Sequence, residues 1–224
     1  MKKTIGVICV LGLLAYFLVL STPVTRLGSG FLISDSPYVF SYYDLVKDAQ
    51  KIVVRFPNED DIPASIVHKN SNLVILKLEE SPKVKRQLLN FSPANHLLHD
   101  KYVFTLGYPW TNTMEDRHNL IEGTLQLESA TPLYKVDMPL DPIHHGGPLF
   151  NNERQVVGML VSGRNSESNS PADPAKNYAI PFSILLETLK AGKLTWQEHG
   201  RNENDSMEQF REAVKNNIVL VEAR

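Results

Sequence analysis

Two adjacent histidines in a turn-rich segment are the residues best suited to chemistry in this sequence. His144 and His145 precede Gly146 and Gly147 in the run Asp-Met-Pro-Leu-Asp-Pro-Ile-His-His-Gly-Gly-Pro-Leu, residues 137–149. Imidazole groups serve as general acids and bases near neutral pH, and they bind zinc, nickel and copper. Neighbouring side chains in a turn point in different directions, so this pair needs partners from elsewhere in the chain to form a metal site.

Residues 137–149 resemble the nucleophile loop of HtrA/Deg-type, trypsin-like serine proteases, which runs Asp-Ala-Ala-Ile-Asn-Pro-Gly-Asn-Ser-Gly-Gly-Pro-Leu. The two segments align without gaps, and the alignment puts His145 at the place of the nucleophilic serine. In the family, a glycine two residues before this serine helps to form the oxyanion hole, and Ile143 replaces it here. Gly146 and Gly147 match the family, and we expect them to serve the tight turn.

Two further segments resemble the family, and each carries a replacement. Residues 41–46, Ser-Tyr-Tyr-Asp-Leu-Val, resemble Thr-Asn-x-His-Val-Val, so Asp44 stands in the place of the general-base histidine. Residues 70–78 resemble Asp-x-Asp-Leu-Ala-Val-Leu-Lys, which places Asn72 where the orienting aspartate belongs. Acyl transfer requires a nucleophile, a base and a group that orients the base. The resemblance therefore implies a pseudoprotease, with degenerate triad positions and without catalytic residues.

The resemblance also implies the fold. It continues through residues 28–33, 155–161 and 177–181 in the family's order, and it covers residues 28–189. It implies an all-β fold of two six-stranded β-barrels, with the former active site in the cleft between them. The sequence agrees, because short runs such as residues 52–56 are rich in β-branched and aromatic residues and are bounded by turn formers.

The N-terminus predicts a membrane segment. Lys2 and Lys3 precede residues 4–22, an uncharged and mostly apolar stretch that is long enough to cross a bilayer as a helix. Positive charge before the span keeps the N-terminus cytoplasmic, so the remainder is expected outside the cytoplasmic membrane, in the periplasm of a Gram-negative cell. A signal peptide cleaved near residues 19–21 is the alternative. We favour an uncleaved, single-pass anchor because the apolar stretch exceeds the usual signal-peptide length.

Composition indicates an ordinary folded domain beyond that segment. The chain has 224 residues, 42% of them hydrophobic, and a net charge of −2, which favours no nucleic-acid partner. Its single cysteine, Cys9, lies in the apolar stretch, so the remainder has no disulfide. We expect an anchor at residues 1–22, a double barrel at residues 23–192 and a partly helical tail at residues 193–224.

The C-terminal part predicts two helices. Pro181 begins one that runs through Lys190, as in the closing helix of the family. Asp205 or Ser206 could cap a second, short helix in the tail, and the apolar run of residues 218–221 follows it. The tail has no counterpart in the family.

The cleft is expected to bind a protein or peptide partner without cofactor. Active relatives hold the substrate as an added strand, a mode that needs only backbone N–H and C=O groups. The predicted binding residues are Ile143, His144, Gly146, Val161, Ser162 and Gly163.

Three alternatives for the former active site stay open at this stage. One is transition-metal binding or acid/base chemistry by Asp44 and His145, with His144 as a further candidate ligand. Another is a hydrogen bond between His145 and Asp44 that merely fills the old site. A third is an architectural subunit of an envelope complex, which would use the outer barrel faces instead of the cleft.

Overall fold

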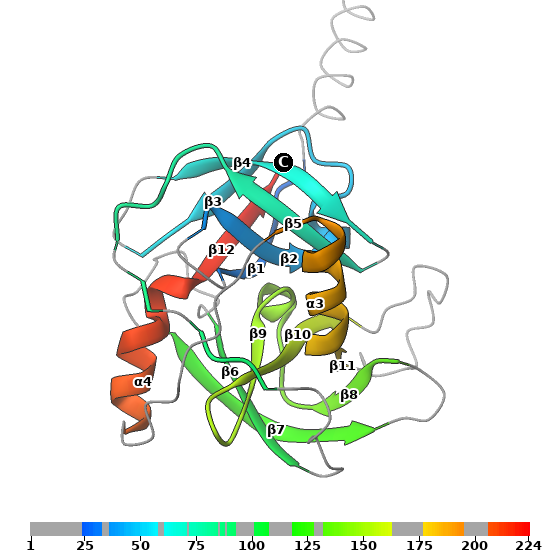
Figure 1. Ribbon diagram of the computed structural model, residues 1–224, viewed down its shortest axis with the longest axis vertical. Coiled ribbons are helices and arrows are strands. Elements are labelled where there is room, and N and C mark those ends of the chain that lie inside the picture. Colours follow the sequence, from blue (N-terminus) through cyan, green and yellow to red (C-terminus); the bar gives the residue numbers. More distant parts are fainter. Residues whose placement is uncertain are drawn as a thin grey trace, which may run out of the picture.

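Two closed barrels of antiparallel strands make up most of the described part of the chain (Figure 1). The computed structural model describes residues 24–32, 36–57, 61–70, 72–84, 86–87, 89–92, 101–107, 118–127, 132–162, 177–194 and 206–224. The first barrel has the strand order β1-β12-β3-β4-β5-β2, and the second has the order β10-β11-β8-β7-β6-β9. The prediction of two six-stranded barrels is confirmed.

The elements follow one another along the chain with short connections in the first barrel. They are β1 (Arg26–Leu32), β2 (Tyr38–Tyr42), α2 (Tyr43–Val46), β3 (Ile52–Arg55), β4 (Ile62–Lys69), β5 (Leu73–Leu78), β6 (Lys101–Gly107), β7 (Asn119–Leu127), β8 (Tyr134–Asp137), η2 (Pro142–His144), β9 (Pro148–Asn151), β10 (Val156–Ser162), β11 (Asn177–Pro181), α3 (Phe182–Ala191), α4 (Met207–Val214), η3 (Lys215–Asn217) and β12 (Ile218–Ala223).

Alternating side chains fill the two barrels, because successive residues of a strand point to opposite faces. The interior of the first barrel contains Val39, Val54 and Val221. The interior of the second contains Val103 and Leu160. A larger cluster lies at the interface and draws on both barrels; it includes Phe31, Phe40, Phe104, Phe150, Leu185 and Ile218. The cleft residues are thus supported from both sides by packed cores.

The tail contributes a strand to the first barrel, which sequence reasoning did not foresee. β12 lies between β1 and β3 and is antiparallel to both, with Ser29 opposite Leu220 and Val54 opposite Val221. All six residues of β12 are buried. The expected boundary at residue 192 therefore does not separate the tail from the barrels, because the first barrel closes only with residues 218–223.

The helix before β12 packs on the second barrel. Ser206 caps α4, since its hydroxyl accepts a hydrogen bond from the Gln209 N–H and the Gln209 side chain accepts one from the Ser206 N–H. The ring of Phe210 meets the rings of Phe104 and Phe150 edge to face, with centroids 6.0 and 5.3 Å away. The segment 206–224 thus contacts both barrels.

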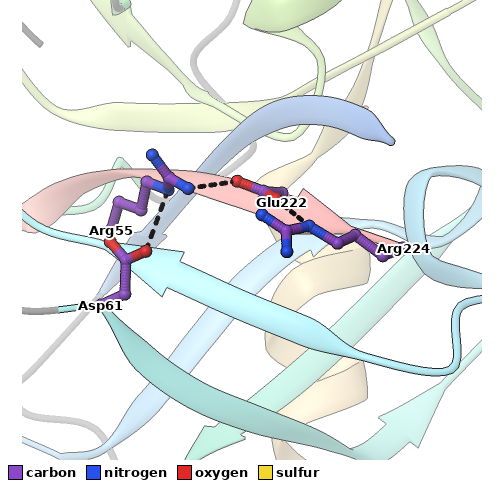
Figure 2. A network of polar contacts seen from close by, with 4 residues as sticks. All are labelled: Arg55, Asp61, Glu222 and Arg224. Carbon is purple, nitrogen blue, oxygen red and sulfur yellow. Dashed lines mark hydrogen bonds and ion pairs between the residues drawn. The ribbon is translucent and has the colours of Figure 1, made fainter. Parts of the chain in front are cut away.

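A polar network fixes β12 at its far end (Figure 2). Glu222 is 4% exposed, and its carboxylate pairs with Arg55 of β3 at 2.5 Å and with Arg224. Asp61 completes the network at 3.4 Å from Arg55. A buried carboxylate is tolerated only where such partners satisfy it, so this contact specifies the register of β12.

Residues 1–22, the expected anchor, lie outside the described residues. Within the part of the chain that the structure describes, no helix combines the length and the apolar character needed to cross a membrane.

Candidate functional site

The segment that resembles a nucleophile loop is a short 3-10 helix followed by a turn. The His144 N–H donates to the Asp141 carbonyl at 3.0 Å, and the His145 N–H donates to the Pro142 carbonyl at 3.2 Å. Pro142 stands at the start of η2, where its fixed φ suits a helix and its missing N–H is not needed. As a result, the backbone donor at position 145 is engaged within the loop.

Gly146 and Gly147 hold this loop against its neighbours. The Gly146 N–H donates to the Leu160 carbonyl of β10 at 2.7 Å, and the Leu160 N–H donates to the Gly147 carbonyl at 2.9 Å. Gly146 has φ +90°, and a Cβ there would overlap the carbonyl oxygen of Ser29. This position therefore requires glycine for its conformation and for the close approach of β1.

Ser29 of β1 joins the loop to the first barrel. Its N–H donates to the His145 carbonyl at 2.9 Å, and its hydroxyl donates to the Ile143 carbonyl at 2.7 Å. Its own carbonyl accepts from the Ser41 hydroxyl at 2.8 Å. Ser29 is fully buried. Sequence reasoning did not identify this residue, because a serine in a glycine-rich strand has no distinctive pattern.

Ile143 occupies the position of the family's oxyanion-hole glycine and is buried. Its side chain packs against Leu220 of β12, and the two form a cluster of their own. The loop is thus held by the chain's C-terminal strand at the residue that departs most from the family pattern.

His144 is a packing residue in this arrangement. It is buried, and its ring fills the space beside Gly107, where a Cβ would overlap His144 Cδ2. Nδ1 accepts a hydrogen bond from the Asp141 N–H at 2.9 Å, while Nε2 is buried without a hydrogen-bond partner. Burial lowers the pKa of His144, so the ring is neutral near pH 7.

Asp44 is engaged by residues of its own segment. Its Oδ2 accepts a hydrogen bond of 2.9 Å from the Tyr42 hydroxyl, and its Oδ1 lies 3.3 Å from Lys47 Nζ. Burial and the bond to Asp44 raise the pKa of Tyr42, so the hydroxyl keeps its proton and donates it. The expected hydrogen bond between His145 and Asp44 is not formed. This expectation was wrong because Tyr42, two residues away, reaches the carboxylate first.

His145 and Asp44 nevertheless line one pocket. Its volume is about 200 Å³, and its walls are Arg26, Leu27, Gly28, Tyr42, Asp44, Leu45, Pro142 and His145. The His145 ring meets the Tyr42 ring edge to face, with centroids 6.2 Å apart. Arg26 Nη1 donates to the Asp44 carbonyl at 3.1 Å and closes one side. Tyr42 and Arg26 are therefore site residues that the sequence did not reveal.

Asn72 lies next to this pocket but does not orient a base. Its carbonyl accepts from the Tyr43 N–H at 3.0 Å, and its N–H donates to the Asn70 side chain at 3.2 Å. Asn70 Oδ1 also accepts from the Leu73 N–H, while Asn70 Nδ2 donates to Thr188 of α3. Asn72 thus serves the turn between β4 and β5, and Asn70 anchors that turn to the second barrel.

The end of β10 presents backbone groups toward the cleft. Leu160 directs its N–H and C=O to Gly147 and Gly146, so strand alternation directs those of Val161 to β11 and those of Ser162 back to the cleft side. Val161 is buried in the core, opposite Tyr178. Gly163 lies outside the described residues.

The described residues contain no group of three or more histidine, cysteine, aspartate or glutamate side chains that could hold a metal ion. His144 and His145 differ in burial and direction, as their packing against Gly107 and Tyr42 demonstrates.

Known proteins resemble this chain at the sequence level. Curated relatives include a probable periplasmic serine endoprotease DegP-like from Pseudomonas fulva, 29% identical over 180 residues, and its counterpart from Ectopseudomonas mendocina, 30% identical over 182 residues. Each alignment covers 75% of this chain and 36% of the relative. The chain therefore spans just over a third of the length of these relatives.

Solved structures resemble it in fold. The serine endoprotease from Yersinia pestis superposes with a TM-score of 0.59 at 19% identity, covering 75% of this chain and 57% of that one. The HtrA-type protease AlgW with a decapeptide gives a TM-score of 0.59 at 16% identity, covering 73% and 50%. The sequence model described as "Trypsin-like peptidase domain" matches residues 28–159. These residues include β1, the pocket and the loop, and the chain belongs to the trypsin-like peptidase family, with an HtrA-type fold.

Proposed function

We propose that this chain is a non-catalytic, HtrA-type domain that binds an extended protein or peptide segment in the former substrate cleft. We further propose that residues 1–22 anchor it in the cytoplasmic membrane, with the barrels outside the cytoplasm. The periplasmic relatives support that placement, as does the apolar segment after Lys2 and Lys3.

The loss of catalysis is proposed from side chains and backbone together. An imidazole, a carboxylate and an amide stand at positions 145, 44 and 72, so none can play its family role. The single observation that carries the proposal is the bond from the His145 N–H to the Pro142 carbonyl. A donor spent inside the loop is unavailable to an oxyanion, and such stabilisation is a large part of acyl-transfer catalysis.

Binding is proposed from what the cleft retains. The loop is still fastened to β10 through Gly146 and Gly147, and the backbone of Ser162 faces the cleft just beyond that point. An added strand needs such backbone groups, whereas its side-chain preferences come from pockets beside them. The pocket next to His145 supplies one such space.

The experiment combines a chemical test with a binding test on the full chain in detergent. A fluorophosphonate probe should leave the protein unlabelled, and fluorescent casein should remain uncleaved. Fluorescein-labelled decapeptides of alternating apolar and polar residues should bind, as measured by fluorescence anisotropy. Labelling of a serine in the cleft would refute the loss of catalysis.

A matched pair of variants tests the binding mode. Ser162→Pro removes the backbone N–H that faces the cleft and should weaken decapeptide binding about tenfold, as expected for one lost hydrogen bond. Ser162→Ala keeps this donor and should bind like the wild type. Equal binding by both variants would exclude strand addition at β10.

A further inference from the structure

The outer face of β12 contacts three different parts of the molecule. Val219, Val221 and Ala223 point into the first barrel. Of the residues between them, Ile218 joins the core between the barrels and Leu220 packs on Ile143, whereas Glu222 pairs with Arg55 of β3.

Leu220 and Ser29 act on Ile143 as a pair. They lie directly opposite each other on β12 and β1. The Ser29 N–H bonds to the loop instead of to β12, so the two form a non-hydrogen-bonded pair, in which side chains lie close together. Ser29 holds the Ile143 carbonyl through its hydroxyl, and Leu220 covers the Ile143 side chain. Both anchors of Ile143 therefore depend on the β1–β12 pairing.

The segment that carries β12 also senses the second barrel. Phe210 of α4 packs on Phe104 and Phe150, and Arg211 donates to the His118 carbonyl at 2.5 Å. His118 in turn contacts the Ile218 carbonyl at 3.3 Å. Docking of residues 206–224 thus requires both barrels in their present positions, while the cleft lies between those barrels.

We propose that β12 sets the conformation of the former nucleophile loop, so that docking of residues 206–224 and occupation of the cleft are coupled. The part that concerns the cleft rests on the proposed function. With β12 in place, Ile143 is held and the His145 N–H stays bonded to Pro142. When β12 leaves, β1 loses its partner strand and Ile143 loses its cover. By linkage, a ligand that favours one loop conformation favours the matching state of β12 by the same factor.

The lining of the β12 slot lies partly outside the matched family region. The family match ends at residue 159, so β12 is an element of this chain beyond the part shared with the family pattern. A control element that is added outside a conserved-pattern core can regulate the cleft without altering the barrels themselves.

Two substitutions in the same strand test the coupling. Leu220→Ala removes the side chain on Ile143, and Val219→Ala removes a buried side chain of the barrel interior. Both should lower overall stability. Only Leu220→Ala should accelerate hydrogen exchange at the Gly146 and Gly147 amides, which are bonded in the loop, and we expect at least tenfold faster exchange than in Val219→Ala.

The binding arm uses the labelled decapeptides. Leu220→Ala should change the dissociation constant at least fivefold relative to Val219→Ala, and bound peptide should alter exchange in β12. If Leu220→Ala fails to fold, Leu220→Val is the milder variant for the same comparison. Equal loop exchange in the two variants would overturn the coupling. Failure of the wild type to bind decapeptides would instead refute the proposed function, and the exchange comparison would still decide on the loop.

Discussion

The Tyr42 hydroxyl donates a hydrogen bond of 2.9 Å to Oδ2 of Asp44. Tyr42 also contacts the His145 ring, so one side chain stands between the residues at two former triad positions. The carboxylate is satisfied locally and the imidazole packs on an aromatic edge. The former active site is thereby converted into a set of structural contacts around a pocket.

Tyr42→Phe should destabilise the protein by about 1–2 kcal/mol, the usual cost of losing a hydrogen bond to a charged group in a partly buried site. Urea unfolding followed by circular dichroism measures this. Tyr178→Phe is the matched control, because the Tyr178 side chain packs on the core and its hydroxyl has no hydrogen bond to the described residues. We expect its effect to stay below about 0.5 kcal/mol. Equal effects would contradict a role for the Tyr42 bond.

Restoring the three family side chains should not restore a protease. The triple variant Asp44→His, Asn72→Asp, His145→Ser keeps the bond from the residue 145 N–H to Pro142 and the contact of Ile143 with Leu220. Adding Ile143→Gly and His144→Asn should raise casein hydrolysis by about a hundredfold, since one oxyanion donor contributes about that factor. A triple variant as active as the fivefold variant would show that only the triad limits catalysis.

Gly146→Ala should unfold or severely destabilise the protein, by more than about 3 kcal/mol. The residue has φ +90°, and the added methyl group would overlap the Ser29 carbonyl. Gly192→Ala is the control, since the nearest atoms to its added Cβ lie 3.4 Å away. Thermal unfolding compares the two. A soluble, wild-type-like Gly146→Ala protein would mean that the loop has another conformation.

Glu222→Gln should cost about 3 kcal/mol, because it leaves the charge of Arg55 without its buried partner. Asp61→Asn removes the more exposed member of the same network, and we expect a loss below about 1 kcal/mol. Urea unfolding of both variants separates the buried pair from the surface pair. A cost for Asp61→Asn equal to that for Glu222→Gln would disprove this order.

Acid should weaken the docking of the tail through His118. Burial lowers the pKa of His118 to about 4, and the neighbouring cations Arg211 and Lys215 act in the same direction. The unfolded chain takes up this proton near pH 6.5, whereas the folded chain resists it. Stability is therefore full above pH 6.5 and falls as pH drops from 6.5 to 4, by about 2–3 kcal/mol at most.

The test compares urea unfolding at pH 7 and pH 4.5 in the wild type and in His118→Gln. Glutamine can still donate to the Ile218 carbonyl but does not titrate, so the variant should lose less stability on acidification. Burial also lowers the pKa of His144, which leaves a smaller residual loss in the variant. An unchanged pH dependence would show that His118 is not the sensitive group.

The strands of the first five positions and the second barrel could be predicted from sequence, because β-branched runs bounded by turn residues mark them clearly. β12 could not be placed, although its apolar run, residues 218–221, was visible. A strand's partners depend on which edge remains open in three dimensions, and the edges of β1 and β3 are far from it in sequence. Local pattern contains no record of such an open edge.

The site was predictable in its frame and not in its contacts. Alignment of residues 137–149 indicated that Ile143 replaces a glycine, but the partner of Ile143, Leu220, comes from the unplaced tail. Asp44 was expected to face His145, and both do line one pocket. Which hydrogen bond Asp44 makes was decided by the reach of Tyr42, a matter of side-chain geometry that sequence spacing does not determine.

The position of β12 has a consequence for how the chain folds. Five strands of the first barrel precede the second barrel in the sequence, yet their sheet remains open at β1 and β3 until residues 218–223 arrive. Pairing between such distant segments is slow, because the loop must close before any contact rewards it. The nascent chain therefore exposes two unpaired strand edges for most of its synthesis, a state prone to aggregation. Both barrels mature together, in one late step.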